Sequence, residues 1–145
     1  MKSSEIISKL PYSEPFLFVD EIESVSEKDI QGNYTFRKNA FFYQGHFKNN
    51  PITPGVILTE CMAQIGVVSF GIYLLGVSSA STPDNAKIAL TSTKIEFYEP
   101  VFPEEKVTVV SEKIYFRFHK LKCSVKMYNK QRKLVCKGEI SGMIV

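Results

Sequence analysis

Cysteine and histidine are scarce in this sequence, with three and two copies in 145 residues. The cysteines form no closely spaced pair and are odd in number, and the histidines lie far apart. A disulfide framework and a dedicated metal site are therefore not expected. We expect Cys61, Cys123 and Cys136 to be reduced, buried side chains of a cytoplasmic protein.

Targeting and linker segments are missing as well. The first five residues contain neither the apolar run nor the small-residue cleavage site of a signal peptide. No Pro/Gly/Ser-rich linker, internal repeat or low-complexity tract divides the chain. Hydrophobic residues make up 44% and charged residues 23%, which is ordinary globular composition. Residues 1–145 are therefore expected to form a single domain.

Positive charge is concentrated in the last third of the chain. Residues 1–105 carry 8 Lys/Arg and 13 Asp/Glu, whereas residues 106–145 carry 10 and 2. Such a segment could steer an acidic partner toward the protein, although lysines that solubilise exposed strands explain it equally well. No dense Lys/Arg run and no nucleic-acid motif accompanies the charge, so a nucleic-acid partner is not expected.

The hydrophobic pattern predicts an α+β fold in which one long helix separates two groups of strands. A short helix is expected over residues 4–9, and a loop over Lys38–Thr53 and again over Ser78–Asn85. The expected strands are Phe16–Val25, Asp29–Arg37, Ala86–Tyr98, Lys106–His119, Leu121–Tyr128 and Lys133–Val145, with a hairpin turn at Asn129–Arg132. An antiparallel sheet curled around the helix would bury that helix on most sides.

The long helix is expected from Pro54 to about Gly76, with Thr53 as N-cap and Pro54 at the first helical position. It is apolar on nearly every side, which is typical of a helix buried all round or of a membrane span. Glu60, Gln64, four glycines and the lack of flanking basic anchors favour the buried helix. No membrane partner is therefore expected.

Glu60 stands out within this helix because its neighbours offer no polar face. The apolar residues around it are Val56, Ile57, Leu58, Met62, Ala63, Ile65 and Val67. Desolvation should raise the pKa of its carboxyl group, as in proteins that keep a carboxylic acid protonated near neutrality. Gln64 lies four residues on, on the same helix face. Its amide either holds the Glu60 carboxyl group or satisfies a backbone or partner-chain group.

Three stretches resemble bacterial β-hydroxyacyl-acyl-carrier-protein dehydratases. LPYSEPFLFVD at residues 10–20 is similar to their L-P-H-R-x-P-F-L-L-V-D segment. GHF at 45–47, PITPGV at 51–56 and ECMAQ at 60–64 resemble their G-H-F-P-G-x-P-x-x-P-G-V-x-x-x-E-A-M-A-Q core without a gap. KIEFYEPVFP at 94–103 is similar to their x-x-x-F-x-x-P-V-x-P turn. The resemblance covers nearly the whole chain.

The resemblance implies a hotdog fold, with a long central helix wrapped by a curved antiparallel sheet of about six strands. It also implies a homodimer joined sheet edge to sheet edge, with His46 of one chain meeting Glu60 of the other. Some relatives assemble further into trimers of dimers. The implied activity is that of a hydro-lyase without cofactor. It converts a (3R)-3-hydroxyacyl group on acyl carrier protein to the trans-2-enoyl form, in fatty-acid or specialised acyl or polyene biosynthesis.

Dehydration must remove a proton from C2 and expel hydroxide from C3. His46 has a suitable side chain for accepting the C2 proton, and a protonated Glu60 could donate to the departing hydroxyl group. The N–H of Gly55, in the first helical turn, could stabilise the thioester oxygen. The resemblance also assigns Phe47 and Pro54 to the substrate site. The candidate contacts for the acidic carrier protein are Arg117, Lys120, Lys122, Lys126, Arg132 and Lys133.

The chain departs from the family pattern at two places. Tyr12 and Ser13 replace a histidine and an arginine, and Lys48-Asn49 replaces the Pro-Gly that follows G-H-F. Loss of that proline frees a backbone angle in the loop that aims His46. Two other functions remain open: a hotdog thioesterase, which would release free thiol, and a non-catalytic subunit that binds acyl carrier protein without turnover.

Overall fold

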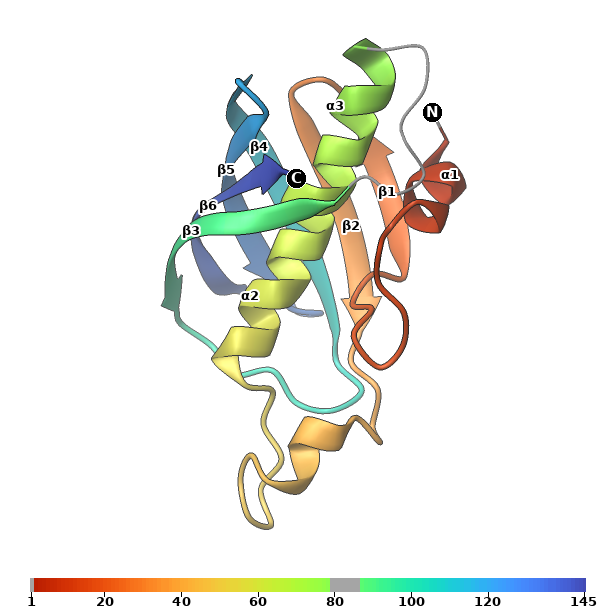
Figure 1. The fold of residues 1–145 in the computed structure, drawn as a ribbon. Helices are drawn as coiled ribbons and strands as arrows, with labels where there is room; N and C mark the ends of the chain where they lie inside the picture. The colour runs from red at the N-terminus through yellow and green to blue at the C-terminus, as the bar shows by residue number, and fades with distance from the viewer. Residues whose placement is uncertain (1, 79–86) are drawn as a thin grey trace.

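The computed structural model describes residues 2–78 and 87–145. Its six strands form one antiparallel sheet in the order β1-β2-β4-β5-β6-β3, which curves around the long helix (Figure 1). The strands are β1 (Glu21–Val25), β2 (Asp29–Thr35), β3 (Ile88–Phe97), β4 (Lys106–Arg117), β5 (Lys120–Tyr128) and β6 (Leu134–Ile144). The helices are α1 (Ser3–Ser8), the 3-10 helix η1 (Phe41–Gln44), α2 (Gly55–Ala63), the π-helical segment η2 (Gln64–Ser69) and α3 (Phe70–Ser78). This arrangement confirms the predicted α+β hotdog fold.

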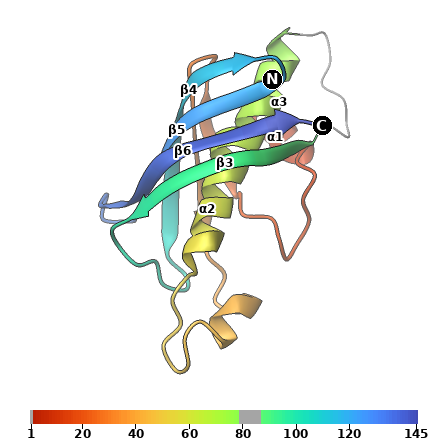
Figure 2. The same cartoon turned by 60° about the vertical axis from the view of Figure 1, so that its left-hand side comes forward.

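The C-terminal strands follow the sequence prediction closely. Figure 2 shows β4, β5, β6 and β3 side by side across the helix. The turn predicted at Asn129–Arg132 joins β5 to β6, and the Asn129 side chain accepts hydrogen bonds from two backbone N–H groups of that turn. The predicted loop Ser78–Asn85 lies outside the described residues except for Ser78, which ends α3.

The predicted strand Phe16–Val25 is wrong over its first half, because β1 begins only at Glu21. The backbone at Phe16 and Phe18 bonds to the long helix instead of to a neighbouring strand, and only at Asp20 does an N–H donate to β2, at the Asn33 carbonyl. Phe18 N–H donates to Gln64 Oε1 at 2.8 Å, and Gln64 Nε2 donates to the Phe16 carbonyl at 3.0 Å. This strand-forming sequence therefore stays irregular, because the buried Gln64 side chain provides the hydrogen-bond partners that a neighbouring strand would otherwise provide.

The predicted start of the long helix is also wrong by one residue. Pro54 is the N-cap, with φ −60° and ψ 141°, and no side chain caps this helix end. The Thr53 hydroxyl group, expected as the cap, is hydrogen-bonded to the Tyr43 phenol instead. The helix therefore enters its first turn at Gly55, whose N–H has no acceptor among the described residues.

The middle of the long helix widens into the π-helical segment η2, which the sequence did not indicate. Two serine hydroxyl groups donate to carbonyl groups there: Ser69 to Gln64 at 2.7 Å and Ser111 to Gly66 at 2.8 Å. A wider turn leaves its carbonyl groups poorly paired within the helix, so these donors stabilise it. The bond from Ser111 also ties the helix to β4.

The long helix forms the centre of the hydrophobic core. Gly55–Ser78 is long and apolar enough to cross a membrane by length and composition, but its most apolar window is 72% buried inside the protein. Every residue from 61 to 70 is buried. Gly66 allows a close approach to the sheet, because a Cβ there would lie 3.0 Å from the Cβ of Ser111. The prediction of a buried central helix is confirmed.

Candidate active site

His46 lies in the loop between η1 and α2, held by its ring and its backbone. Its Nδ1 lies 2.8 Å from the Ile52 carbonyl oxygen. A carbonyl can only accept, so Nδ1 carries the hydrogen of the neutral ring and Nε2 keeps its lone pair. The His46 carbonyl accepts the Ile52 N–H at 2.8 Å, so two hydrogen bonds join these residues. The arrangement leaves Nε2 available as a base.

The turn beyond His46 contains the departure from the family pattern. Phe47 and Asn50 exchange backbone hydrogen bonds of 2.9 and 3.1 Å, with Lys48 and Asn49 at the tip. Asn49 has a φ of 57°, a left-handed conformation that asparagine adopts more easily than most residues. Asparagine therefore stands where the family's glycine would be, and the turn closes without the proline.

A depression of about 320 Å³ opens beside His46 and the start of α2. It is lined by His46, Ile52, Thr53, Gly55, Leu58, Phe97, Tyr98, Glu99 and Pro100. The Phe97 ring covers Gly55 so closely that a Cβ at Gly55 would lie 3.1 Å from the ring. The depression thus brings together a basic ring nitrogen and a helix start with a free N–H, the two groups predicted to handle the C2 proton and the thioester oxygen.

Phe47 and Pro54 have different positions relative to this depression. The Phe47 ring stacks on the His46 ring, with centroids 3.9 Å apart, and is 52% exposed. Pro54 instead accepts the backbone N–H groups of Ile57 and Leu58, which closes the first helical turn. Neither residue lines the depression, so Phe47 orients the imidazole and Pro54 shapes the helix start.

Glu60 lies on α2 and is partly buried. Burial raises the pKa of its carboxyl group above the ordinary value of 4.5, and a hydrogen bond from Gln64 acts in the opposite direction. The predicted direction of the shift is confirmed. The expectation of an apolar surrounding on all sides is wrong at one residue, because Val56 is 77% exposed.

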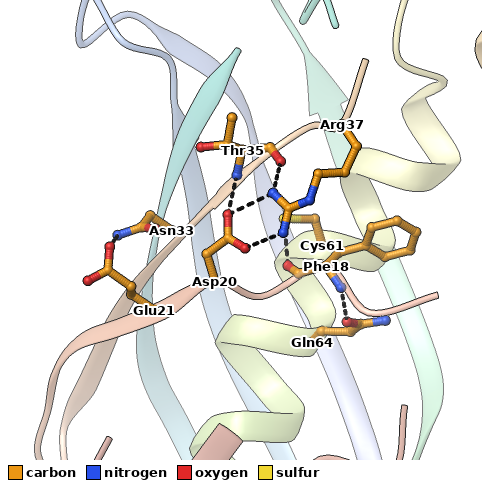
Figure 3. A network of polar contacts seen from close by, with 8 residues as sticks. All are labelled: Phe18, Asp20, Glu21, Asn33, Thr35, Arg37, Cys61 and Gln64. Carbon is orange, nitrogen blue, oxygen red and sulfur yellow. Dashed lines mark hydrogen bonds and ion pairs between the residues drawn. The ribbon is translucent and has the colours of Figure 1, made fainter. Parts of the chain in front are cut away.

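Gln64 fulfils both roles that the sequence left open. Its side chain is fully buried, and its Nε2 donates to Glu60 Oε2 at 2.9 Å as well as to the Phe16 carbonyl. Figure 3 shows its Oε1 accepting the Phe18 N–H. Because a backbone N–H only donates, it fixes which end of the amide faces Phe18 and turns the NH₂ group toward Glu60.

A tyrosine missed as a site residue lies near Glu60. The pKa of Tyr12 is raised to about 12, first by burial and second by the Glu60 carboxylate. Its ring also packs against Phe16, with centroids 6.5 Å apart. The sequence offered one signal for Tyr12, because this residue replaces the family's histidine. That replacement changes the polar group near Glu60.

The structure does not bring His46 and Glu60 together within one chain. Among residues 2–78 and 87–145, no hydrogen bond or ion pair joins them. Glu60 is also absent from the depression that His46 lines.

The basic residues fall into two groups, one along the outer face of β5 with its hairpin and one at the β5–β6 turn. Lys120, Lys122 and Lys126 alternate with buried residues, so they share the outer face of the strand, and Arg117 pairs with Lys120 across the β4–β5 hairpin. Lys122 forms an ion pair of 3.2 Å with Glu139. These four residues belong to the hairpin and the middle of the sheet.

Arg132 and Lys133 lie instead at the turn between β5 and β6. Lys133 lines a second depression of about 380 Å³ together with Glu99 and Pro100. Those two residues also line the depression beside His46. The β5–β6 turn is thus the part of the basic segment that adjoins the candidate site.

Within the described part of the chain, no group of three or more His, Cys, Asp or Glu residues could hold a metal ion. All three cysteines are free and buried, as predicted. Burial raises the pKa of the Cys61 thiol well above its usual value. These thiols therefore belong to the core rather than to the candidate site.

Known proteins resemble this chain over nearly its full length. The sequence model of the FabA-like domain family matches residues 10–140. A 3-hydroxyacyl-[acyl-carrier-protein] dehydratase FabZ of Caldicellulosiruptor saccharolyticus is 33% identical over 138 residues, covering 94% of each chain. One from a Wolbachia of Brugia malayi is 39% identical over 113 residues, covering 75% of this chain and 73% of the relative.

Solved structures share the fold at low sequence identity. The dehydratase heterocomplex ApeI:P of Xenorhabdus doucetiae has a chain with a TM-score of 0.78 and 11% identity, covering 97% of this chain and 90% of that one. A hypothetical thioesterase of Streptococcus pneumoniae, crystallised with coenzyme A, has a TM-score of 0.63 and 14% identity, covering 86% and 84%. At these identities the likeness concerns the hotdog fold alone.

Proposed function

Because the chain belongs to the FabA-like domain family, we propose that it is a 3-hydroxyacyl-acyl-carrier-protein dehydratase, a hydro-lyase of acyl-chain biosynthesis. Its substrate is a (3R)-3-hydroxyacyl thioester, and its products are the trans-2-enoyl thioester and water. The observation that carries the proposal is the fixed tautomer of His46 beside the free N–H of Gly55. These are the base and the oxyanion donor that removal of a proton next to a thioester requires.

The reaction begins at C2 of the substrate. His46 Nε2 takes the C2 proton, and the electron pair left on C2 is delocalised onto the thioester oxygen. The N–H of Gly55, at the positive end of the α2 dipole, stabilises that oxygen. Formation of the C2–C3 double bond then expels the hydroxyl group from C3.

Glu60 supplies the proton that converts the departing hydroxyl group to water. Gln64 donates to Oε2, so the acidic proton of neutral Glu60 is carried by Oε1, the oxygen that Gln64 leaves free. Partial burial raises the pKa of Glu60 and keeps a larger share of it protonated near neutral pH. The cycle closes when Glu60 regains a proton from solvent and His46 releases one.

The active site is proposed to form between two copies of the chain, with His46 of one and Glu60 of the other. The absence of Glu60 from the lining of the depression beside His46 supports this arrangement. β3, one of the two edge strands of the sheet, presents an exposed row that a second sheet can extend. A homodimer would thus hold two sites, each built from both chains.

The partner that delivers the substrate is acyl carrier protein, as the names of the relatives state for those proteins. Among the six basic candidates, Lys133 at the β5–β6 turn is the best placed, because it lines a depression that shares Glu99 and Pro100 with the one beside His46. Reduced, buried cysteines support a cytoplasmic location for this partnership.

The test is turnover of a (3R)-3-hydroxyacyl thioester followed by mass spectrometry. His46→Ala and Glu60→Gln are compared with the parent, and His119→Ala and Glu139→Gln serve as matched controls at exposed positions. The proposal is supported if the parent forms the enoyl thioester and the rate falls by about a hundredfold or more in His46→Ala and Glu60→Gln but not in the two controls. Release of free acid and thiol would identify a thioesterase. Binding of acyl carrier protein without turnover would identify a non-catalytic subunit.

A further inference from the structure

The segment between α1 and β1 is anchored through Asp20 to β2 and to Arg37, two residues beyond the end of β2. Thr35 N–H donates to Asp20 Oδ2 at 2.8 Å. The Arg37 guanidinium donates to Asp20 Oδ1 at 2.6 Å and to Oδ2 at 3.2 Å, and also to the Thr35 carbonyl at 2.6 Å. Figure 3 shows this fork closing over the Asp20 carboxylate. Both carboxylate oxygens are thus held in a fixed position.

Two residues before Asp20, the same segment is joined to the helix that carries Glu60. Phe18 N–H donates to Gln64 Oε1, and the Phe18 carbonyl accepts from Cys61 Sγ at 3.4 Å. Only Val19 separates Phe18 from Asp20. The Asp20–Arg37 pair is thus one of the contacts that hold this segment, beside the Asp20 N–H bond to the Asn33 carbonyl and the burial of Phe18. The Phe18 N–H in turn fixes how the Gln64 amide is turned.

A row of aromatic rings follows the same path. The Arg37 guanidinium lies 4.8 Å from the centroid of the Tyr34 ring. Tyr34 meets Phe18 edge to face at 5.6 Å, and Phe18 meets Phe16 at 5.1 Å. Phe16 packs against Tyr12, which interacts with Glu60. Packing and hydrogen bonds thus lead by two routes from Arg37 to the carboxyl group of Glu60.

We propose that the Asp20–Arg37 ion pair is a positioning unit for Glu60, acting through the Phe18 N–H and the Gln64 amide. The inference rests on the proposed function, in which Glu60 donates a proton. Neither Asp20 nor Arg37 lines the depression beside His46, so the pair acts through other residues and not on the substrate.

If the Asp20–Arg37 pair served only to stabilise the fold, its loss would lower the free energy of unfolding without changing the pKa of Glu60. The side chains of Arg37 and Asp20 are 44% and 26% exposed, so solvent screening limits the contribution of even this bidentate pair to a small part of the total stability. Loss of the pair should therefore leave the protein folded but release the Phe18 segment. The Gln64 amide can then rotate, and Glu60 loses the donor that favours its charged form. Its pKa should rise, and the carboxyl group should no longer face the leaving hydroxyl group.

The direction in which the pKa of Glu60 changes distinguishes loss of positioning from the direct effect of removing a charge. Removing the Asp20 charge would by itself lower the pKa of Glu60, and removing the Arg37 charge would raise it. Loss of positioning raises it in both cases. The titratable groups that interact with Glu60 are Tyr12 and Cys61, whose pKa values are about 12 and well above 9. Both stay neutral over the range in which Glu60 titrates.

The experiment compares Asp20→Asn and Arg37→Gln with the parent in kcat and KM for a small 3-hydroxyacyl thioester across pH. Arg37→Lys is included because it keeps the charge without the fork, and Glu139→Gln is the control for a surface ion pair. We expect kcat to fall between about tenfold and hundredfold with KM unchanged. The high-pH limb of the profile should move upward in both variants, and less in Arg37→Lys. In a Gln64→Leu background the shift should vanish.

A ¹³C titration of the Glu60 carboxyl group, assigned with Glu60→Gln, gives a readout that does not depend on turnover. Shifts of opposite sign in Asp20→Asn and Arg37→Gln, or parent-like titrations in both folded variants, would overturn the inference. If the parent does not dehydrate the substrate, the proposed function fails, and the carboxyl titration still decides whether the pair positions Glu60.

Discussion

The amide of Gln64 lies 2.9 Å from the carboxylate of Glu60, one helical turn away on the same face of the long helix. The orientation of that amide is set by Phe18 N–H, which belongs to a different part of the chain. The protonation site of the proposed acid therefore depends on a backbone group of an irregular segment as well as on its own helix.

Gln64→Leu tests the contribution of this amide. The variant removes the donor to Glu60 and leaves the buried Phe18 N–H without its acceptor. An unsatisfied buried polar group costs about 1–3 kcal/mol, so urea denaturation should show a lower free energy of unfolding. Turnover should fall, with the high-pH limb of its profile moved upward because Glu60 loses a stabiliser of its charged form. If turnover were unimpaired, Gln64 would have a structural role only.

Glu60→Gln should stabilise the fold at alkaline pH. The pKa of Glu60 is raised in the folded protein, so its contribution to stability is fully present below the unfolded pKa and is lost as pH rises through the folded pKa. Glutamine does not ionise and avoids this loss. The variant should have a higher Tm than the parent at pH 8, and the difference should shrink toward pH 4. A difference independent of pH would contradict the raised pKa.

Mixing two inactive variants tests whether the site is shared between chains. A dimer of one His46→Ala chain and one Glu60→Gln chain would contain one doubly defective site and one intact site. Random re-association should then restore about a quarter of the parent activity, since half of the dimers are mixed. Mixtures that stay inactive after verified subunit exchange would place both residues in one chain's site.

Charge reversal should show which of the two basic groups contacts acyl carrier protein. Arg132→Glu with Lys133→Glu should raise KM for carrier-bound substrate and leave KM for a small thioester unchanged, because the turn adjoins the candidate site. Lys120→Glu with Lys126→Glu, a change of equal charge on β5, should have the smaller effect. If the changes at Lys120 and Lys126 raised KM more, the docking surface would be the outer face of the sheet.

Gly55→Ala tests the proposed oxyanion donor. The added Cβ would lie 3.1 Å from the Phe97 ring, which can move aside by a few tenths of an ångström. We expect a folded protein whose kcat falls by about ten- to a hundredfold, because the methyl group and the displaced ring narrow the approach to the free N–H. Thermal unfolding serves as the control, and a parent-like kcat would assign the thioester oxygen to another donor.

Much of the fold could be predicted because each element contains its own signal. Alternation of apolar and polar residues located β4, β5 and β6 to within a few residues, and uniform apolarity indicated that the long helix is buried. The resemblance to the dehydratase family, whose motif has the same spacing of His46, Gly55 and Glu60, pointed to the chemistry proposed for the site. These features depend on residues near one another in the sequence.

The sequence by itself thus determined the element types, the buried helix and the identity of the chemical groups. Only the tertiary structure decided that Phe16–Asp20 is not a strand, that the helix contains a π segment, and that Gln64 serves both Glu60 and the Phe18 backbone. It also divided the basic residues between the outer face of β5 and the β5–β6 turn. The physical reason is that hydrogen bonds between distant segments replace local pairing, and no local pattern of residues records which distant partner a buried polar group will find.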